Sequence, residues 1–201
     1  MQVTARWLAA CLLALSCAAA ASAPELRAGV FDPPRAAPDF TLPATNGATL
    51  RLSQYHGKVV ALAFGYTHCP GVCPATLAYL AHARKSLGDA GRDLQVVYVT
   101  VDPERDDAKQ LREFLAGFDP SFIGGTGTPA QLAKVRQEYG ITVSDKIRPK
   151  AMPGAEYYLD HSSFIYLIDR AGQLRGMLPF GVTSDDIEHD VRVLLASNPS
   201  R

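Results

Sequence analysis

The stretch KVVALAFGYTHCPGVCPATLAYLAHARKSL, residues 58–87, joins an apolar run to a helical pattern through two cysteines. Residues 58–66 are almost continuously apolar, which is typical of a strand buried on both faces. In residues 75–87 the apolar side chains recur at helical spacing, so this segment is predicted to be a helix. Cys69 and Cys73 therefore fall in a strand-to-helix loop, the place where α/β sheets commonly hold their ligands.

The same two patterns alternate along the rest of the chain. Further elements are predicted from their periodicity, turn residues and capping residues: strands at 93–102 and within 162–180, and helices at 106–118, 128–140 and 183–197. Two short strands flank the turn signal Asn46-Gly47 and predict an N-terminal β-hairpin. This order indicates an α/β fold with a mixed central sheet flanked by helices. Its β-α-β-α-β-β-α core resembles the thioredoxin-like fold, with an additional helix and the N-terminal β-hairpin extension.

Residues 1–23 differ in composition from the rest of the chain. One cationic residue precedes an apolar middle and a run of small residues, which is the layout of a secretory signal peptide cleaved near Ala21 or Ala23. An uncleaved membrane anchor is the main alternative, because the apolar run is slightly short of a normal span. A lipid anchor at Cys11 or Cys17 is a weaker alternative. Each of these predicts an exported protein.

The remaining residues are predicted to form a linker and one domain. Residues 24–38 are rich in Pro and Ala and are interpreted as the linker, and residues 39–198 as the domain. The formal net charge of the chain is zero, so no strongly basic surface indicates binding to nucleic acid.

Two cysteines this close allow three roles: a structural disulfide, a redox pair or a pair of metal ligands. A helix N-terminus lowers the pKa of a nearby thiol and raises its thiolate fraction. Residues i and i+4 lie on one face of a helical turn, so the sulfurs of Cys69 and Cys73 can converge. The spacing is one residue longer than the usual redox Cys-x-x-Cys. This difference favours a soft metal, with Cu(I) the natural candidate, although the other two roles stay open.

A third ligand would complete trigonal coordination, and the histidines are the candidates. His68 adjoins Cys69, but neighbours along an extended chain point apart. His161 comes just before the predicted strand within 162–180. If that strand runs antiparallel to 58–66, its start lies at the same edge of the sheet as Cys69, which makes His161 the best candidate. Asp102, at another strand tip, is interpreted either as a turn residue or as a site residue.

Three segments resemble the Sco/SenC family of copper chaperones for cytochrome c oxidase assembly. They are FGYTHCPGVCP at 64–74, VTVDPERD at 99–106 and YLDHSSFIYLID at 158–169. The resemblance spans about residues 38–196 and implies a thioredoxin-like fold with a family-specific hairpin insertion. It also implies that Cys69, Cys73 and His161 bind copper, as Cu(I) and as Cu(II). Many family members carry Asp where this chain has Gly71, which bears on copper affinity and partner contact.

The resemblance implies an exported copper chaperone in the periplasm or at the outer face of the inner membrane. Its partners would be cytochrome c oxidase subunit II, or another copper-accepting protein, and a thiol-disulfide reductant. In that family the same thiols, here Cys69 and Cys73, also reduce the cysteines of the binuclear copper site. The alternative is a metal-independent thiol-disulfide oxidoreductase of the cell envelope. The remaining hypotheses are a peroxidase, which usually needs an arginine near its cysteine, and a purely structural domain.

Overall fold

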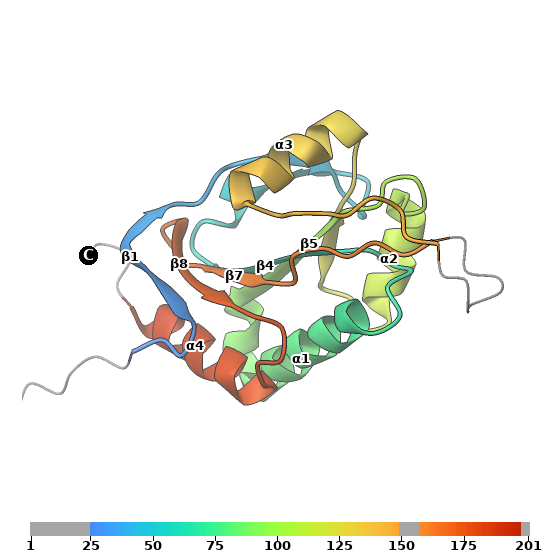
Figure 1. Ribbon diagram of the computed structural model, residues 1–201. Coiled ribbons are helices and arrows are strands. Elements are labelled where there is room, and N and C mark those ends of the chain that lie inside the picture. The colour runs from blue at the N-terminus through green and yellow to red at the C-terminus, as the bar shows by residue number, and fades with distance from the viewer. Residues whose placement is uncertain (1–24, 149–156, 198–201) are drawn as a thin grey trace, which may run out of the picture.

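The computed structural model describes residues 25–148 and 157–197 (Figure 1). The predicted export segment 1–23, which contains Cys11 and Cys17, lies outside the described residues. Among the helices that are described, none is long and apolar enough to cross a lipid bilayer. The choice between signal peptide and membrane anchor therefore stays a prediction.

A six-stranded mixed sheet forms the centre of the fold, in the order β1-β8-β7-β4-β5-β6. Its strands are β1 (Gly29–Ala36), β4 (Val59–Gly65), β5 (Leu94–Thr100), β6 (Ile123–Gly125), β7 (Ile165–Ile168) and β8 (Gln173–Leu178). β4, β5 and β6 are parallel, whereas β7 is antiparallel to β4 and β8 is antiparallel to β7. The predicted mixed sheet is thus confirmed, and so is the thioredoxin-like fold class.

Helices cover both faces of this sheet. They are α1 (Val72–Ser86), α2 (Ala108–Ala116), α3 (Pro129–Tyr139) and α4 (Ser184–Ala196). In Figure 1, α1 and α4 lie together against one face, and α3 lies over the other. The side chains of Asp107, Thr128 and Thr183 cap the N-termini of α2, α3 and α4. The helix predicted at 75–87 begins earlier than expected, so Cys73 belongs to its first turn.

The predicted N-terminal hairpin is also present. β2 (Thr41–Pro43) and β3 (Thr49–Arg51) pair as a separate two-stranded sheet. Two short 3₁₀ helices, Leu52–Tyr55 and Gly88–Asp93, complete the described elements.

Two strands escaped the sequence analysis. Residues 24–38 were interpreted as a linker, but β1 lies within them and pairs antiparallel with β8. The Asp32-Pro33-Pro34 segment argued against a strand, because proline has no backbone N–H to donate to a β-ladder. Proline is therefore found in sheets only at edge strands and irregularities. β1 is such an edge, and its register shifts between Val30 and Arg35. The other missed strand, β6, is short and contains two glycines.

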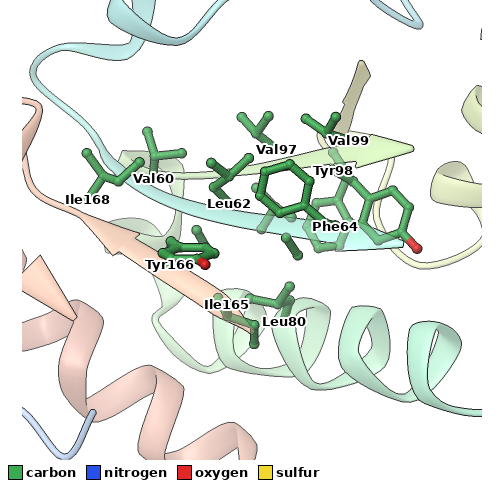
Figure 2. Close-up of a cluster of buried hydrophobic side chains, with 14 of the residues drawn as sticks. Val60, Leu62, Phe64, Leu80, Val97, Tyr98, Val99, Ile165, Tyr166 and Ile168 are labelled. Carbon is green, nitrogen blue, oxygen red and sulfur yellow. The ribbon is translucent and has the colours of Figure 1, made fainter. Parts of the chain in front are cut away.

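The core divides into two layers on either side of β4. Side chains alternate along the strand, so Val60, Leu62 and Phe64 share one face and Ala61, Ala63 and Gly65 share the other. Figure 2 shows the larger residues gathered with Tyr166 on the first face. The small residues of the second face leave room for α1, whose Leu77 and Leu80 are fully buried. α1 can therefore approach the sheet closely and place its first turn at the tip of β4.

A buried carboxylate fastens the N-terminal segment to α4. Asp190 is 0% exposed and accepts backbone N–H bonds from Arg27 at 2.7 Å and from Ala28 at 2.8 Å. His189 Nδ1 lies 2.9 Å from the same carboxylate. These contacts lead the chain into β1 at the edge of the sheet.

We expect Asp190→Ala to lower the free energy of unfolding by about 2–4 kcal/mol, because two buried N–H groups lose their acceptor. Asp185→Ala, at an exposed position in the first turn of the same helix, should change it by less than about 0.5 kcal/mol. Urea unfolding followed by circular dichroism measures both variants. Equal losses in the two variants would show that Asp190 is not an anchor.

Candidate metal centre

The cysteine loop connects the tip of β4 to the first turn of α1. Gly71 precedes the helix as its N-cap, and Cys73 lies in the first turn. Cys73 is 2% exposed, whereas Cys69 is partly exposed, and the two are free thiols. The backbone N–H of Cys73 points at Cys69 Sγ over 3.4 Å. The helix N-terminus thus offers one of its unpaired donors to the first sulfur.

His161 reaches the same place from the neighbouring strand. β7 is antiparallel to β4, with Ala63 opposite Ile165, so the chain before β7 arrives at the tip of β4. His161 Nε2 lies 3.4 Å from Cys73 Sγ. The two sulfurs and one imidazole nitrogen lie within 4.8 Å of one another and form a group that can hold a metal ion. The edge expected for His161 from the sequence is therefore confirmed.

The other histidines face elsewhere. His68 Nδ1 lies 3.0 Å from Thr67 Oγ1, on the side of the loop toward α2. His56 packs close to Gly172, at the opposite end of β4. His161 is thus the histidine that the fold brings to the cysteines.

A backbone hydrogen bond fixes the protonation pattern of the His161 ring. Its Nδ1 lies 2.9 Å from the carbonyl oxygen of Ser162, which can only accept, so Nδ1 carries the proton. Nε2 is then left with a free lone pair directed toward the sulfurs. Outer partners of this kind commonly orient histidines that ligate metals. The ring also stands edge-on to Tyr66, with centroids 5.9 Å apart.

The two thiols differ in acidity because they share a hydrogen bond. The side-chain hydrogen bond from Cys73 lowers the pKa of Cys69 far below its usual value, more than burial raises it. Donation to Cys69, together with burial, raises the pKa of Cys73. The pair therefore holds one proton at neutral pH, with the negative charge on the more exposed sulfur.

Asp106 holds the cysteine loop in place, and the sequence analysis missed this residue. Its buried carboxylate accepts the backbone N–H of Thr67 at 3.0 Å and the Thr67 hydroxyl at 2.6 Å. Thr100, at the end of β5, donates a third bond at 2.7 Å. Burial raises the pKa of Asp106, and these hydrogen bonds offset part of that rise. Its segment was already singled out for resemblance, but only Asp102 was weighed as a site residue.

Asp102 organises the turn and the chain that leads to His161. It accepts Arg105 Nε at 2.6 Å and the Tyr157 hydroxyl at 2.8 Å, while Arg105 donates to the Tyr157 carbonyl. Arg105 also lies over the Tyr157 ring, 3.6 Å from its centroid. Of the two roles left open for Asp102, the structure thus supports that of the turn residue.

Tyr66, beside the cysteine loop, holds the chain just before His161 in place through hydrogen bonds. The Tyr66 hydroxyl accepts the N–H of Leu159 at 3.0 Å and donates to its carbonyl at 3.2 Å. Beyond it, isolated antiparallel bridges pair Val143 with His161 and Ile147 with Tyr158. These bridges hold residues 158–161 alongside residues 143–147.

The centre opens to solvent beside Cys69. A cleft of about 560 Å³ runs along the loop. It is lined largely by apolar groups of Tyr66, Pro70, Val72 and Leu159, together with Cys69 itself. Gly71 borders the cleft, and a side chain at its position would meet open space. One sulfur is thus reachable from outside, while the other is enclosed.

The donor set suits a soft ion. Thiolate and imidazole ligands favour copper or zinc over the harder magnesium and calcium, and structural zinc sites are usually four-coordinate. The described residues gather three such donors here. Three donors of this softness fit a copper ion, with an open side for exchange.

The fold and the site together define a class of protein. It is a thioredoxin-like domain that carries Cys-x-x-x-Cys at a strand tip and a histidine delivered by the adjacent antiparallel strand. The family model described as SCO1/SenC matches residues 31–196. The chain belongs to this SCO1/SenC family.

Curated relatives agree with this assignment. The chain is 37% identical over 135 residues to the mitochondrial protein SCO2 of Saccharomyces cerevisiae. This match covers 67% of this chain and 44% of that protein. It is 35% identical over 135 residues to a SCO2-like protein of Rickettsia conorii, covering 67% of this chain and 65% of that one. The chain thus spans between about two fifths and two thirds of the length of these relatives.

A solved structure shows the same fold. ScoI of Bradyrhizobium japonicum, determined with copper bound, superposes with a TM-score of 0.71 at 31% identity. The match covers 80% of this chain and 99% of that one.

We expect iodoacetamide to alkylate Cys69 of the reduced protein almost as fast at pH 6 as at pH 8. The lowered pKa keeps Cys69 a thiolate throughout this range, whereas an ordinary thiol with a pKa of about 8.5 would react roughly 100-fold faster at pH 8. Peptide mapping by mass spectrometry follows each cysteine separately. Cys73, which is buried, should react only after unfolding, including in the Cys69→Ser variant. An ordinary pH dependence at Cys69 would contradict the described hydrogen bonding.

Proposed function

We propose that this protein is an exported copper chaperone that delivers copper to the binuclear copper site of cytochrome c oxidase subunit II. The observation that carries the proposal is the convergence of Cys69 Sγ, Cys73 Sγ and His161 Nε2 within 4.8 Å. Supporting it, the similar ScoI of Bradyrhizobium japonicum is known with copper bound. The family resemblance of the three sequence motifs supports the assembly role. Both Cu(I) and Cu(II) would bind here, with the thiolates as the principal donors.

Copper would leave by ligand exchange. An acceptor thiolate approaches along the cleft and replaces Cys69, whose sulfur is the exposed one. His161 and Cys73 are then displaced in turn, and each protein thiolate lost is matched by one gained, so the oxidation state of the ion is unchanged. An acceptor that presents two cysteines in an extended segment can enter the cleft and supply a thiolate for each one that this protein loses.

The proposed location is the periplasm or the outer face of the inner membrane. Its support is the composition of residues 1–23, with its apolar middle and small residues. Attachment to the membrane through this segment is part of the proposal.

The second candidate function is reduction of the acceptor's disulfide by the same two thiols. The asymmetry of the pair favours it: Cys69 is exposed and thiolate-like, whereas Cys73 is protonated behind it. The Cys69 thiolate attacks one sulfur of the disulfide and releases the other as a thiolate, giving a mixed disulfide. Cys73, after losing its proton, attacks Cys69 Sγ, releases the second thiolate and closes the Cys69–Cys73 disulfide. An external dithiol reductant would return the pair to its starting state.

Anaerobic titration of the reduced protein with Cu(I) tests the chaperone proposal. We expect one ion per chain, and we expect Cys73→Ala to weaken binding by more than about 100-fold, since even outer-shell changes at metal sites cost about 10–100-fold. Competition with a chromogenic Cu(I) chelator measures both affinities. Stoichiometry near zero, or unchanged affinity in Cys73→Ala, would refute the proposal.

His161→Ala separates the two functions. We expect Cu(II) binding to weaken by more than about tenfold, because the only nitrogen donor of the group is lost. Reduction of a model disulfide peptide should persist in the same variant. His82→Ala, at an exposed position on α1, is the control and should change neither quantity. Loss of reductase activity with intact Cu(II) binding would contradict both the role of His161 as a copper ligand and the independence of disulfide reduction from His161.

A further inference from the structure

Tyr98, on β5, carries a buried hydroxyl that is not accounted for by the fold. The residue is 1% exposed, and among the described residues its Oη has no partner in good hydrogen-bond geometry, although it interacts with the Cys73 side chain. Other tyrosine hydroxyls of the core are satisfied by backbone oxygens: Tyr139 donates to Pro38 at 2.8 Å and Tyr166 donates to Tyr139 at 2.5 Å. The Tyr98 ring packs against Phe114, with centroids 6.4 Å apart, and this contact does not need the hydroxyl.

The hydroxyl is directed at the metal centre. A Cβ placed on Gly65, the last residue of β4, would lie 2.1 Å from Tyr98 Oη and 2.7 Å from Cys73 Sγ. Oxygen and sulfur therefore crowd the same point, which is free because residue 65 has no side chain. Figure 2 shows the Tyr98 oxygen at the end of β4, beyond the packed rings of the core. Cys73 Sγ is thus the polar atom that the hydroxyl faces.

A buried hydroxyl without a partner costs about 1–3 kcal/mol, and phenylalanine would fill the same space without it. A neutral thiol is a weak acceptor, whereas a charged sulfur accepts a much stronger hydrogen bond. The sulfur of Cys73 takes on that negative character when it binds a metal. The hydrogen bond from the Tyr98 hydroxyl is then stronger in the loaded protein than in the empty one.

We propose that Tyr98 is a positioning residue that donates a hydrogen bond to the copper-bound sulfur of Cys73 and thereby favours Cu(I) over Cu(II). The inference rests on the proposed copper function. A hydrogen bond to a ligating sulfur reduces the electron density that it gives to the metal, and the more highly charged Cu(II) loses more from this than Cu(I). Tyr98 reaches the sulfur from the β5 side, while His161 contacts it at the rim of the sheet, so the two do not compete.

The test is Tyr98→Phe in the full chain, loaded with Cu(I) or Cu(II). We expect the ratio of Cu(I) to Cu(II) affinity to fall about 3- to 10-fold, the effect of one hydrogen bond. By the one-electron conversion this lowers the Cu(II)/Cu(I) reduction potential by about 30–60 mV. The sulfur-to-Cu(II) charge-transfer band should move to longer wavelength, because the sulfur lone pair is no longer stabilised. The Tm of the reduced, copper-free protein should stay the same or rise.

Tyr166→Phe is the matched control, a buried sheet tyrosine whose hydroxyl bonds to backbone. It should lower the Tm of the copper-free protein and leave the potential and the charge-transfer band unchanged. An unshifted potential and band in Tyr98→Phe would overturn the inference alone, as would equal shifts in both variants. A wild-type protein that takes up no copper would overturn the proposed function together with this inference.

Discussion

The antiparallel pairing of β7 with β4 is the constraint on which the site depends. It sets the start of one strand beside the end of the other, so a histidine 88 residues away in sequence meets Cys73. Parallel pairing would send the chain before β7 to the far end of the sheet, where His56 lies. Because both strands are wholly buried, a slip of one residue would turn every side chain to the wrong layer. The burial that stabilises the core therefore also fixes where the ligands meet.

Two carboxylates from one turn hold the two halves of the centre. The segment after β5 directs Asp106 to the cysteine loop through Thr67, and directs Asp102 to the histidine segment through Tyr157. Both acids are buried and hydrogen-bonded, so loss of either would leave unpaired polar groups inside the protein. A turn that contributes no ligand thus sets the distance between the ligands.

The sequence predicted those parts of the molecule that depend on local pattern. The continuous apolar run before Cys69 and the helical period after it predicted the strand-loop-helix unit. The edge of His161 followed only on the condition that the strand after it runs antiparallel to 58–66, which the pairing of β7 with β4 fulfils. What it did not predict depends on tertiary contact. β1 exists because β8 offers a free edge, despite its prolines. Asp106 and Tyr98 acquire their roles only because β5 lies next to β4, a neighbour relation that no periodicity reveals.

The unequal burial of the two cysteines explains how one site can both hold and release a soft ion. An ion held by two exposed thiolates would be lost to any competitor, and one held by two enclosed thiolates would exchange only after local unfolding. Here Cys73 is fixed by the helix, by His161 and by the closeness of Gly65, while Cys69 lies along an open cleft. The enclosed sulfur retains the ion while the exposed one is replaced, so the first step of exchange takes place at the cleft. The same asymmetry makes Cys69 the attacking thiolate in disulfide chemistry, so both proposed activities follow from one difference in exposure.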